Sequence, residues 1–170
     1  MEEVINILFL DIDGVLYPCR NRKSFKLDPI KIRKQLKEEK HLDFNEINDS
    51  TLLSVYEGFT KEAIMYLQNL TNNHIKIVIS SNWKFRYTLS TLKKLFLIHD
   101  IEIYDVIPNS YGILKQTYIQ TYLTKHPEIT NYVIVDDVYM HTFQHHFVKC
   151  DDTLNKNVYL KILKKFQIKC

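Results

Sequence analysis

Short apolar runs alternate with amphipathic segments along the 170-residue chain. Val4 to Leu10 is almost continuously apolar and stops abruptly at Asp11. This pattern is typical of a strand that is buried on both faces of a parallel sheet. Comparable runs predict further strands at residues 75–79, 101–107 and 132–135, and a short last strand at residues 147–150.

Helices are predicted between these strands. Asp28-Pro29 has the form of a helix N-cap followed by proline at the first helical position, and residues 30–40 continue as a basic helix. Thr60 can cap a helix over residues 61–70, with an apolar stripe at helical spacing. Other helices are expected at residues 87–96, 114–124 and 158–166, whereas residues 41–59 show no clear period. The alternation predicts an α/β fold with a parallel sheet between helices on both faces.

Polar clusters follow three of the predicted strands. They are Asp11 with Asp13, Ser80 with Ser81, and Asp136 with Asp137. Because ligands of parallel α/β sheets bind beyond the carboxyl ends of the strands, all three clusters are expected at one edge of the sheet.

The two acidic pairs suit a divalent cation. Gly14 permits a sharp turn after Asp11-Ile12-Asp13, and adjacent acids would repel each other strongly without a counter-charge. Mg²⁺ prefers carboxylate oxygens and water, and it would also neutralise a substrate phosphate. A calcium loop is disfavoured because Val15, Leu16 and Tyr17 follow where further oxygen ligands would be required.

Ser80 and Lys115 complete a phosphate-binding set. A small hydroxyl at a strand end can donate to a phosphate oxygen, and Lys115 at a helix start could offset the charge of a phosphorylated aspartate. Taken alone, each residue is also consistent with an ordinary loop serine or a solvated lysine.

The order of these residues resembles the four motifs of the haloacid dehalogenase (HAD) superfamily. The matching positions are Phe9-Leu10-Asp11-Ile12-Asp13-Gly14-Val15-Leu16, Ile79-Ser80, Lys115 and Val135-Asp136-Asp137. Ser80-Ser81-Asn82-Trp83-Lys84 also resembles the signature of a subgroup that includes stand-alone domains and domains joined to RNA-repair proteins. The chain departs from that subgroup at Lys84, where arginine is usual, and at residues 153–156, where a small glycine-containing turn is usual.

The resemblance implies a Rossmann-like core of three α/β/α layers and a phosphatase mechanism. Asp11 would be the nucleophile that forms an aspartyl-phosphate, and Asp13 would act as general acid and base. Mg²⁺ would be held by Asp11, by the backbone carbonyl of Asp13 and by Asp136 or Asp137. Ser80, Ser81 and Lys115 would bind the phosphoryl group, with Asn82, Trp83 and Lys84 as candidate substrate contacts. Residues 18–73 occupy the position of a cap and are long enough only for a small helical insert in a single domain spanning residues 1–170.

Composition and charge bear on the cellular location and on the partners of the protein. Three widely spaced cysteines, no apolar run of membrane-spanning length and no N-terminal signal pattern predict a cytoplasmic protein. The net charge is only +3, but residues 20–40 and 156–169 are rich in Lys and Arg. These segments are either solvated helix faces or a positive rim for a polyanion. The oligomeric state stays open.

Three functions are compared. The first is an Mg²⁺-dependent phosphomonoester hydrolase that acts on a nucleotide or on a nucleic-acid terminal phosphate. The second is a catalytically silent module of the same fold that binds nucleic acid or protein, although a binder needs no complete set of catalytic residues. The third, a phosphoryl-accepting receiver domain, places its acids and hydroxyl in a different order along the chain.

A zinc site is disfavoured, because His141, His145 and His146 lack a fourth ligand for zinc.

Overall fold

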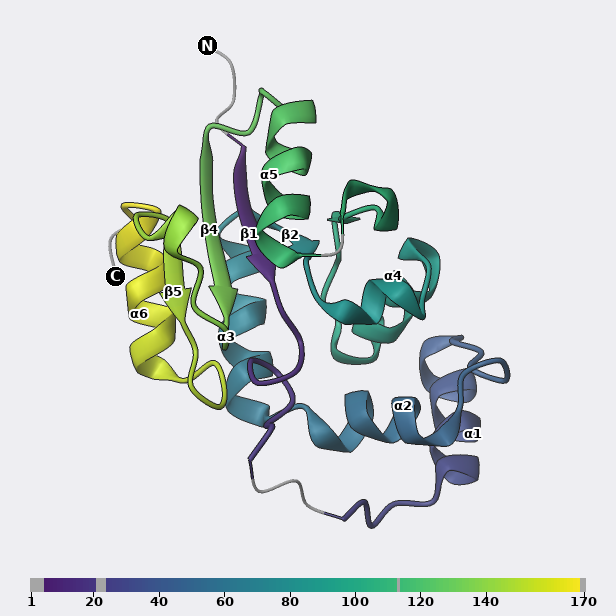
Figure 1. The fold of residues 1–170 in the computed structure, drawn as a ribbon. Helices are drawn as coiled ribbons and strands as arrows, with labels where there is room; N and C mark the ends of the chain where they lie inside the picture. The colour runs from purple at the N-terminus through teal and green to yellow at the C-terminus, as the bar shows by residue number, and fades with distance from the viewer. Residues whose placement is uncertain (1–4, 21–23, 113, 169–170) are drawn as a thin grey trace.

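The structure is a computed structural model that describes residues 5–20, 24–112 and 114–168. Val4, Arg22, Lys23, Lys169 and Cys170, which contributed to the sequence analysis, lie outside the described residues. Within them, five parallel strands form one sheet in the order β3-β2-β1-β4-β5 (Figure 1). The predicted α/β class with a parallel sheet is therefore confirmed.

The strands agree closely with the apolar runs, with one exception. They are β1 (Asn6–Leu10), β2 (Ile75–Ile79), β3 (Asp105–Val106), β4 (Asn131–Asp136) and β5 (Phe147–Lys149). The prediction of a strand over residues 101–107 was too long, because only Asp105 and Val106 pair with β2. Ile101 and Ile103 are buried all the same, so their apolar pattern reflects a loop packed into the core.

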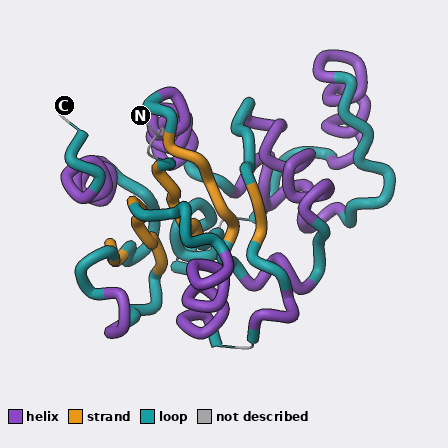
Figure 2. Tube along the Cα trace, turned by 90° about the horizontal axis from the view of Figure 1, so that it is seen from above, coloured by secondary structure: helices purple, strands orange, loops and turns teal. Residues whose placement is uncertain are grey.

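Helices cover both faces of the sheet (Figure 2). The longer ones are α1 (Pro29–Lys40), α3 (Lys61–Asn72), α4 (Leu89–Phe96), α5 (Lys115–Lys125) and α6 (Lys156–Lys165), and α2 (Asp49–Leu53) is short. Ile7 and Phe9 of β1 pack with residues of α5, whereas Leu8 and Leu10 pack with residues of α3, α4 and α6. This alternation along β1 produces the three layers.

Side-chain caps fix several helix starts. Asp28 accepts a hydrogen bond from the N–H of Ile30 and Thr60 accepts one from Ala63, as the sequence predicts. Thr88 is the N-cap of α4, which begins at Leu89 instead of the predicted residue 87. Asn155 is the N-cap of α6, which begins two residues before the predicted residue 158. The helix ends are therefore set by local capping residues rather than by the apolar stripe alone.

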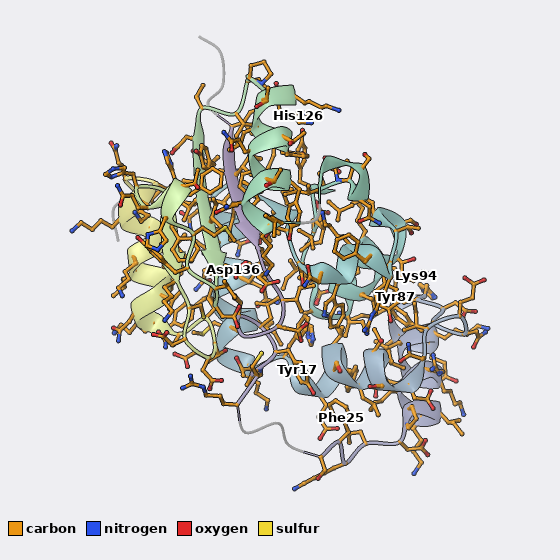
Figure 3. All side chains as sticks on the ribbon, in the orientation of Figure 1. Tyr17, Phe25, Tyr87, Lys94, His126 and Asp136 are labelled. Carbon is orange, nitrogen blue, oxygen red and sulfur yellow. The ribbon has the colours of Figure 1, made fainter. Side chains whose placement is uncertain are left out.

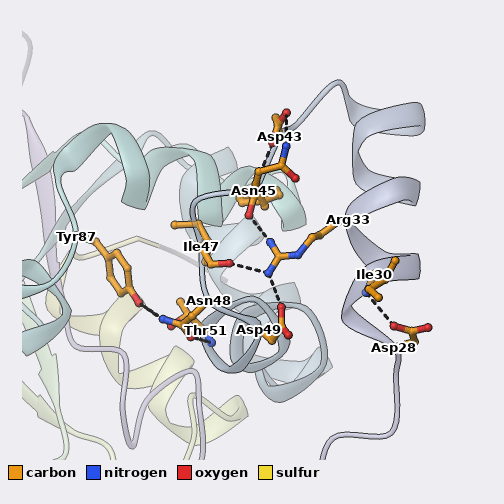
Figure 4. A network of polar contacts seen from close by, with 11 residues as sticks. Asp28, Ile30, Arg33, Asp43, Asn45, Ile47, Asn48, Asp49, Thr51 and Tyr87 are labelled. Atoms are coloured by element: carbon orange, nitrogen blue, oxygen red, sulfur yellow. Dashed lines mark hydrogen bonds and ion pairs between the residues drawn. The ribbon is translucent and has the colours of Figure 1, made fainter.

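The segment between β1 and α3 contains α1, α2 and a π-helix, Ser54–Gly58. It lies beyond the carboxyl end of β1 (Figure 1). Arg33 of α1 holds this insert together by donating hydrogen bonds to the carbonyls of Phe44 and, at 2.7 Å, Ile47, and by an ion pair of 2.5 Å with Asp49 (Figure 4). Its guanidinium therefore has a structural role and is not available to a polyanion.

The two basic segments do not form one surface. Helices α1 and α6 lie at opposite ends of the molecule in two views that differ by 90° (Figures 1 and 2). Lys40 of α1 also pairs with Asp100 at 2.7 Å and donates to the carbonyl of Ile98 at 3.0 Å. The alternative of a continuous positive rim is thus wrong for these segments.

Two smaller outcomes concern other parts of the chain. His141 lies in a 3₁₀ turn, His141–Phe143, and β5 follows directly after His146, so these histidines do not share one helix. No helix among the described residues is long and apolar enough to span a membrane.

Candidate active site

The three polar clusters meet at the carboxyl edge of the sheet. β1 pairs with β2 on one side and β4 on the other, in a register that aligns Leu10 with Ile79 and with Val135. The residues that follow these three positions therefore emerge side by side. Figure 3 shows Asp136 at this edge, with Tyr17 lying beyond it toward α2.

Lys115 joins the two acidic clusters. Its ammonium lies 2.7 Å from Oδ2 of Asp11 and 2.8 Å from Oδ2 of Asp136. Asp11 and Asp136 are buried, and Lys115 is the first residue of α5. Burial opposes the charge of Lys115, but the two carboxylates outweigh this effect and raise its pKa. The lysine is therefore fully charged at neutral pH.

A second cation would fit among the acids. One carboxylate oxygen each from Asp11, Asp136 and Asp137 lie within 4.8 Å of one another. Burial, together with the charge of Asp11, raises the pKa of Asp136 even though Lys115 opposes the shift. Three carboxylates with one lysine leave excess negative charge, which a hard divalent cation would neutralise. The donor set is all oxygen and fits Mg²⁺.

Gly14 allows Asp137 to approach. Its φ is +78°, and a Cβ at this position would lie 2.7 Å from Oδ2 of Asp137. A side chain at residue 14 would thus displace the carboxylate of Asp137. The turn is closed by a 2.7 Å hydrogen bond from the N–H of Gly14 to the carbonyl of Tyr17. The glycine that the sequence analysis assigned to a sharp turn is also required by this contact.

Asp13 is not part of the three-acid cluster, although the sequence analysis placed it in the same site. Its Oδ2 accepts a 2.9 Å hydrogen bond from the indole Nε1 of Trp83. The sequence analysis gave Trp83 as a candidate substrate contact, but it did not anticipate this bond. The predicted contribution of the Asp13 backbone carbonyl to metal binding stays a prediction.

Ser80 and Ser81 have different surroundings. The Ser80 hydroxyl is buried and has no hydrogen-bond partner among the described residues, so it is available to a ligand oxygen. Its carbonyl accepts a 2.6 Å bond from the Tyr118 hydroxyl, and that phenol was missed by the sequence analysis. Ser81 is buried too, and its hydroxyl caps the 3₁₀ helix Asn82–Phe85 by accepting from the N–H of Trp83.

Lys84 is the least expected member of the site. Only 4% of the residue is exposed, and its ammonium lies 3.3 Å from the centroid of the Tyr118 ring. It has no hydrogen-bond partner among the described residues. Burial lowers its pKa to about 8. Asn82, by contrast, is exposed. The three candidate substrate contacts therefore have different surroundings: Asn82 is exposed, the indole of Trp83 bonds to Asp13, and Lys84 is buried over the Tyr118 ring.

A parallel α/β sheet that gathers paired aspartates, a serine and a lysine at its carboxyl edge defines a protein of the HAD superfamily. Residues 7–155 match the family model described as the HAD domain in Swiss Army Knife RNA repair proteins. Because this match covers most of the chain, the protein belongs to that family, and membership supports phosphatase-type chemistry. Comparisons with curated proteins and with solved structures gave no match.

Proposed function

We propose that the protein is an Mg²⁺-dependent phosphomonoester hydrolase that works through an aspartyl-phosphate. The observation that carries this proposal is the double ion pair of Lys115 with Asp11 and Asp136, with an Asp137 oxygen close by. A purely structural lysine needs one buried acid to balance it, whereas this arrangement places a nucleophile candidate inside a cation-binding cluster. The proposal includes the roles of the site residues, which we assign from this geometry and from family membership.

Each step is assigned to a residue. A carboxylate oxygen of Asp11 forms a bond to phosphorus while the bond from phosphorus to the substrate oxygen breaks. Asp13 donates its proton to that departing oxygen, and it then takes a proton from the water that attacks the phosphoryl group. This second attack releases inorganic phosphate and restores Asp11.

The remaining groups stabilise charge. Asp11, Asp136 and Asp137 would hold Mg²⁺, which supplies electrostatic stabilisation of the phosphoryl oxygens when it is bound. Lys115 provides a positive charge at the nucleophile, and the Ser80 hydroxyl donates to a phosphoryl oxygen. Family membership favours a nucleotide or a nucleic-acid terminal phosphate as substrate, since the family description names RNA repair proteins.

The direct test is hydrolysis of p-nitrophenyl phosphate by the purified protein. Activity is expected with Mg²⁺, and it should disappear when EDTA is added. Asp11→Asn should abolish turnover while the melting temperature confirms folding, and Asp151→Asn, which alters an exposed acid, is the matched control. An Asp11→Asn protein that turns over at the wild-type rate would exclude Asp11 as the nucleophile. A wild-type protein without activity would favour the silent binding module instead.

A further inference from the structure

A polar cavity of about 290 Å³ adjoins Asp13 on the side of the insert. Asp13 and Trp83 line it from the core, the hydroxyl residues Ser50, Thr51 and Ser54 line it from the insert, and Arg86 lies at its wall. A larger cavity of about 510 Å³ is lined by Asn6, His74 and Ile75, where β1 and β2 begin. It therefore lies at the edge of the sheet opposite to the candidate site.

The position of the smaller cavity assigns it to the leaving group. Asp13 is the residue proposed above to protonate the departing oxygen, so the part of the substrate attached to that oxygen must lie beside Asp13. The hydrogen bond from Trp83 fixes the Asp13 carboxylate in the cavity wall. Asp11, Asp136 and Asp137 are not among the residues that line this cavity, so it can hold the part of the substrate beyond the phosphoryl group.

The wall is polar and ordered by its own hydrogen bonds. The hydroxyls of Thr51 and Tyr87 lie 2.6 Å apart, and Asn48 donates to the same phenol (Figure 4). The Ser54 hydroxyl donates to the carbonyl of Ser50, one turn earlier. A wall of hydroxyl groups with the indole of Trp83 beside it suits a sugar, which offers several hydroxyls and one weakly polar face.

Arg86 adds a positive charge to this wall. Its side chain is exposed and makes no hydrogen bond or ion pair with the residues that the structure describes. This distinguishes it from Arg33, whose guanidinium is occupied within the insert. Guanidinium groups bind phosphate oxygens in bidentate fashion, so a cation at this position suits a second phosphate on the leaving sugar.

We propose that this cavity is the leaving-group subsite and holds the terminal sugar of a nucleic-acid end, with Arg86 binding the neighbouring phosphodiester. The inference rests on the proposed phosphatase function and adds the substrate class to it. The volume suits a single sugar unit rather than a large ligand. Because Arg86 is exposed, the rest of a nucleic-acid chain can continue into solvent.

Adenosine 3′,5′-bisphosphate is the minimal probe, because its ribose carries both a scissile and a second phosphate. In wild-type protein with Mg²⁺, its kcat/KM should exceed those of adenosine 3′-monophosphate and adenosine 5′-monophosphate by about tenfold, the effect of one charged hydrogen-bond pair. Arg86→Gln should remove this advantage by raising KM for the bisphosphate, so that the kcat/KM values of the bisphosphate and of the two monophosphates become similar. Lys93→Gln removes an exposed charge at the far cavity and should change none of the three.

The outcomes separate the subsite from the proposed function. Equal losses on mono- and bisphosphates after Arg86→Gln, or no loss on either, would overturn the subsite. A stronger preference for glucose 1,6-bisphosphate than for the adenosine compound would overturn the nucleic-acid assignment. Binding of adenosine 3′,5′-bisphosphate to Asp11→Asn protein, measured by calorimetry, gives a readout that needs no turnover. If the wild-type protein is inactive but its affinity for the bisphosphate still falls about tenfold with Arg86→Gln, the phosphatase function is refuted. The assignment of the cavity as a binding site for this ligand would then still hold.

Discussion

The indole nitrogen of Trp83 donates a 2.9 Å hydrogen bond to Oδ2 of Asp13, which lies 70 residues earlier in the chain. The ring also packs near Phe59 and Tyr87, with centroids 6.4 Å and 6.0 Å away, so packing holds the donor in place. The Asp13 carboxylate, which we propose exchanges a proton with the substrate, is thereby held in one orientation. Trp83 is a positioning residue for the proposed general acid.

Trp83→Phe keeps an aromatic ring but removes this donor. A hydrogen bond to a charged group contributes roughly 1.5–3 kcal/mol, so the loss should reduce kcat by about tenfold or more where proton transfer matters. An alkyl phosphate requires protonation of its departing oxygen, whereas p-nitrophenolate leaves without it. We therefore expect a large effect on an alkyl phosphate and a small one on p-nitrophenyl phosphate.

The comparison of leaving groups is the control for folding. A variant that merely unfolds or distorts the site would lose activity equally on both substrates, and that result would remove the positioning role of Trp83. Phe85→Leu alters an exposed ring in the same 3₁₀ helix and should leave the ratio of the two kcat values unchanged.

Lys115→Met tests the charge balance of the acidic cluster. Removing the lysine leaves Asp11 and Asp136 buried without their partner, which should destabilise the metal-free protein by about 3–5 kcal/mol. Mg²⁺ binds the folded state and relieves the same repulsion, so it should raise the melting temperature of the variant more than that of the wild type. Turnover should be lost in both conditions.

Lys149→Met provides the comparison for this experiment. Lys149 pairs with Asp151 at 2.8 Å on the surface, where such pairs contribute little. Its melting temperature and its response to Mg²⁺ should match the wild type. An equal Mg²⁺ response in Lys115→Met and wild type would show that the lysine and the metal do not share the same acids.

Much of the acidic site could be predicted because parallel strands impose it. Once residues 6–10, 75–79 and 131–136 are recognised as neighbouring strands, the residues after them must meet at one edge. Lys115 followed from its place at a helix start. The sequence predicted a turn at Gly14 but not its contact with Asp137, because the distance between two chain-distant loops has no local signal.

The cavity wall could not be predicted, for a physical reason. Ser50, Thr51 and Ser54 lie in the insert, where a five-residue helix runs into a π-helix and shows no regular period. The i, i+4 spacing of Ser50 and Ser54 was the available signal, because it places two hydroxyls on one face of a helix. Arg86 and Lys84 are both basic residues beside Trp83, and only the fold reveals that one is exposed and the other buried.

Gly14→Ala tests the approach of Asp137. The new Cβ would meet Oδ2 of Asp137, and the φ of +78° would add a strain of about 1–3 kcal/mol. We expect lower stability and a Mg²⁺-induced rise in melting temperature that is much smaller than in the wild type. Gly112→Ala is the matched control, because its φ is +132° and its Cβ would face Thr117 instead of an acid. If both variants kept the full Mg²⁺ response, Asp137 would not be a ligand.

Lys84 makes the free energy of unfolding depend on pH, and the burial of its ammonium determines the direction of the change. Its pKa falls from 10.5 to about 8 on folding because burial disfavours the ammonium. Below pH 8 both the folded and the unfolded chain carry the proton, and the full cost of burying the charge is present. Between about pH 8 and 10.5 the folded protein loses the proton first, so this cost decreases as the pH rises, by at most about 3 kcal/mol.

Lys84→Met removes the titrating group while it keeps a long apolar side chain against Tyr118. At pH 7 the variant should be as stable as the wild type or more stable, because an unpaired buried ammonium has been removed. As the pH rises from 7 to 9.5, the wild type should gain stability relative to the variant, measured as the difference in unfolding free energy in urea. Lys93→Met, at an exposed position, should show no such trend. A constant difference for Lys84→Met across this range would mean that Lys84 is protonated to the same extent in both states.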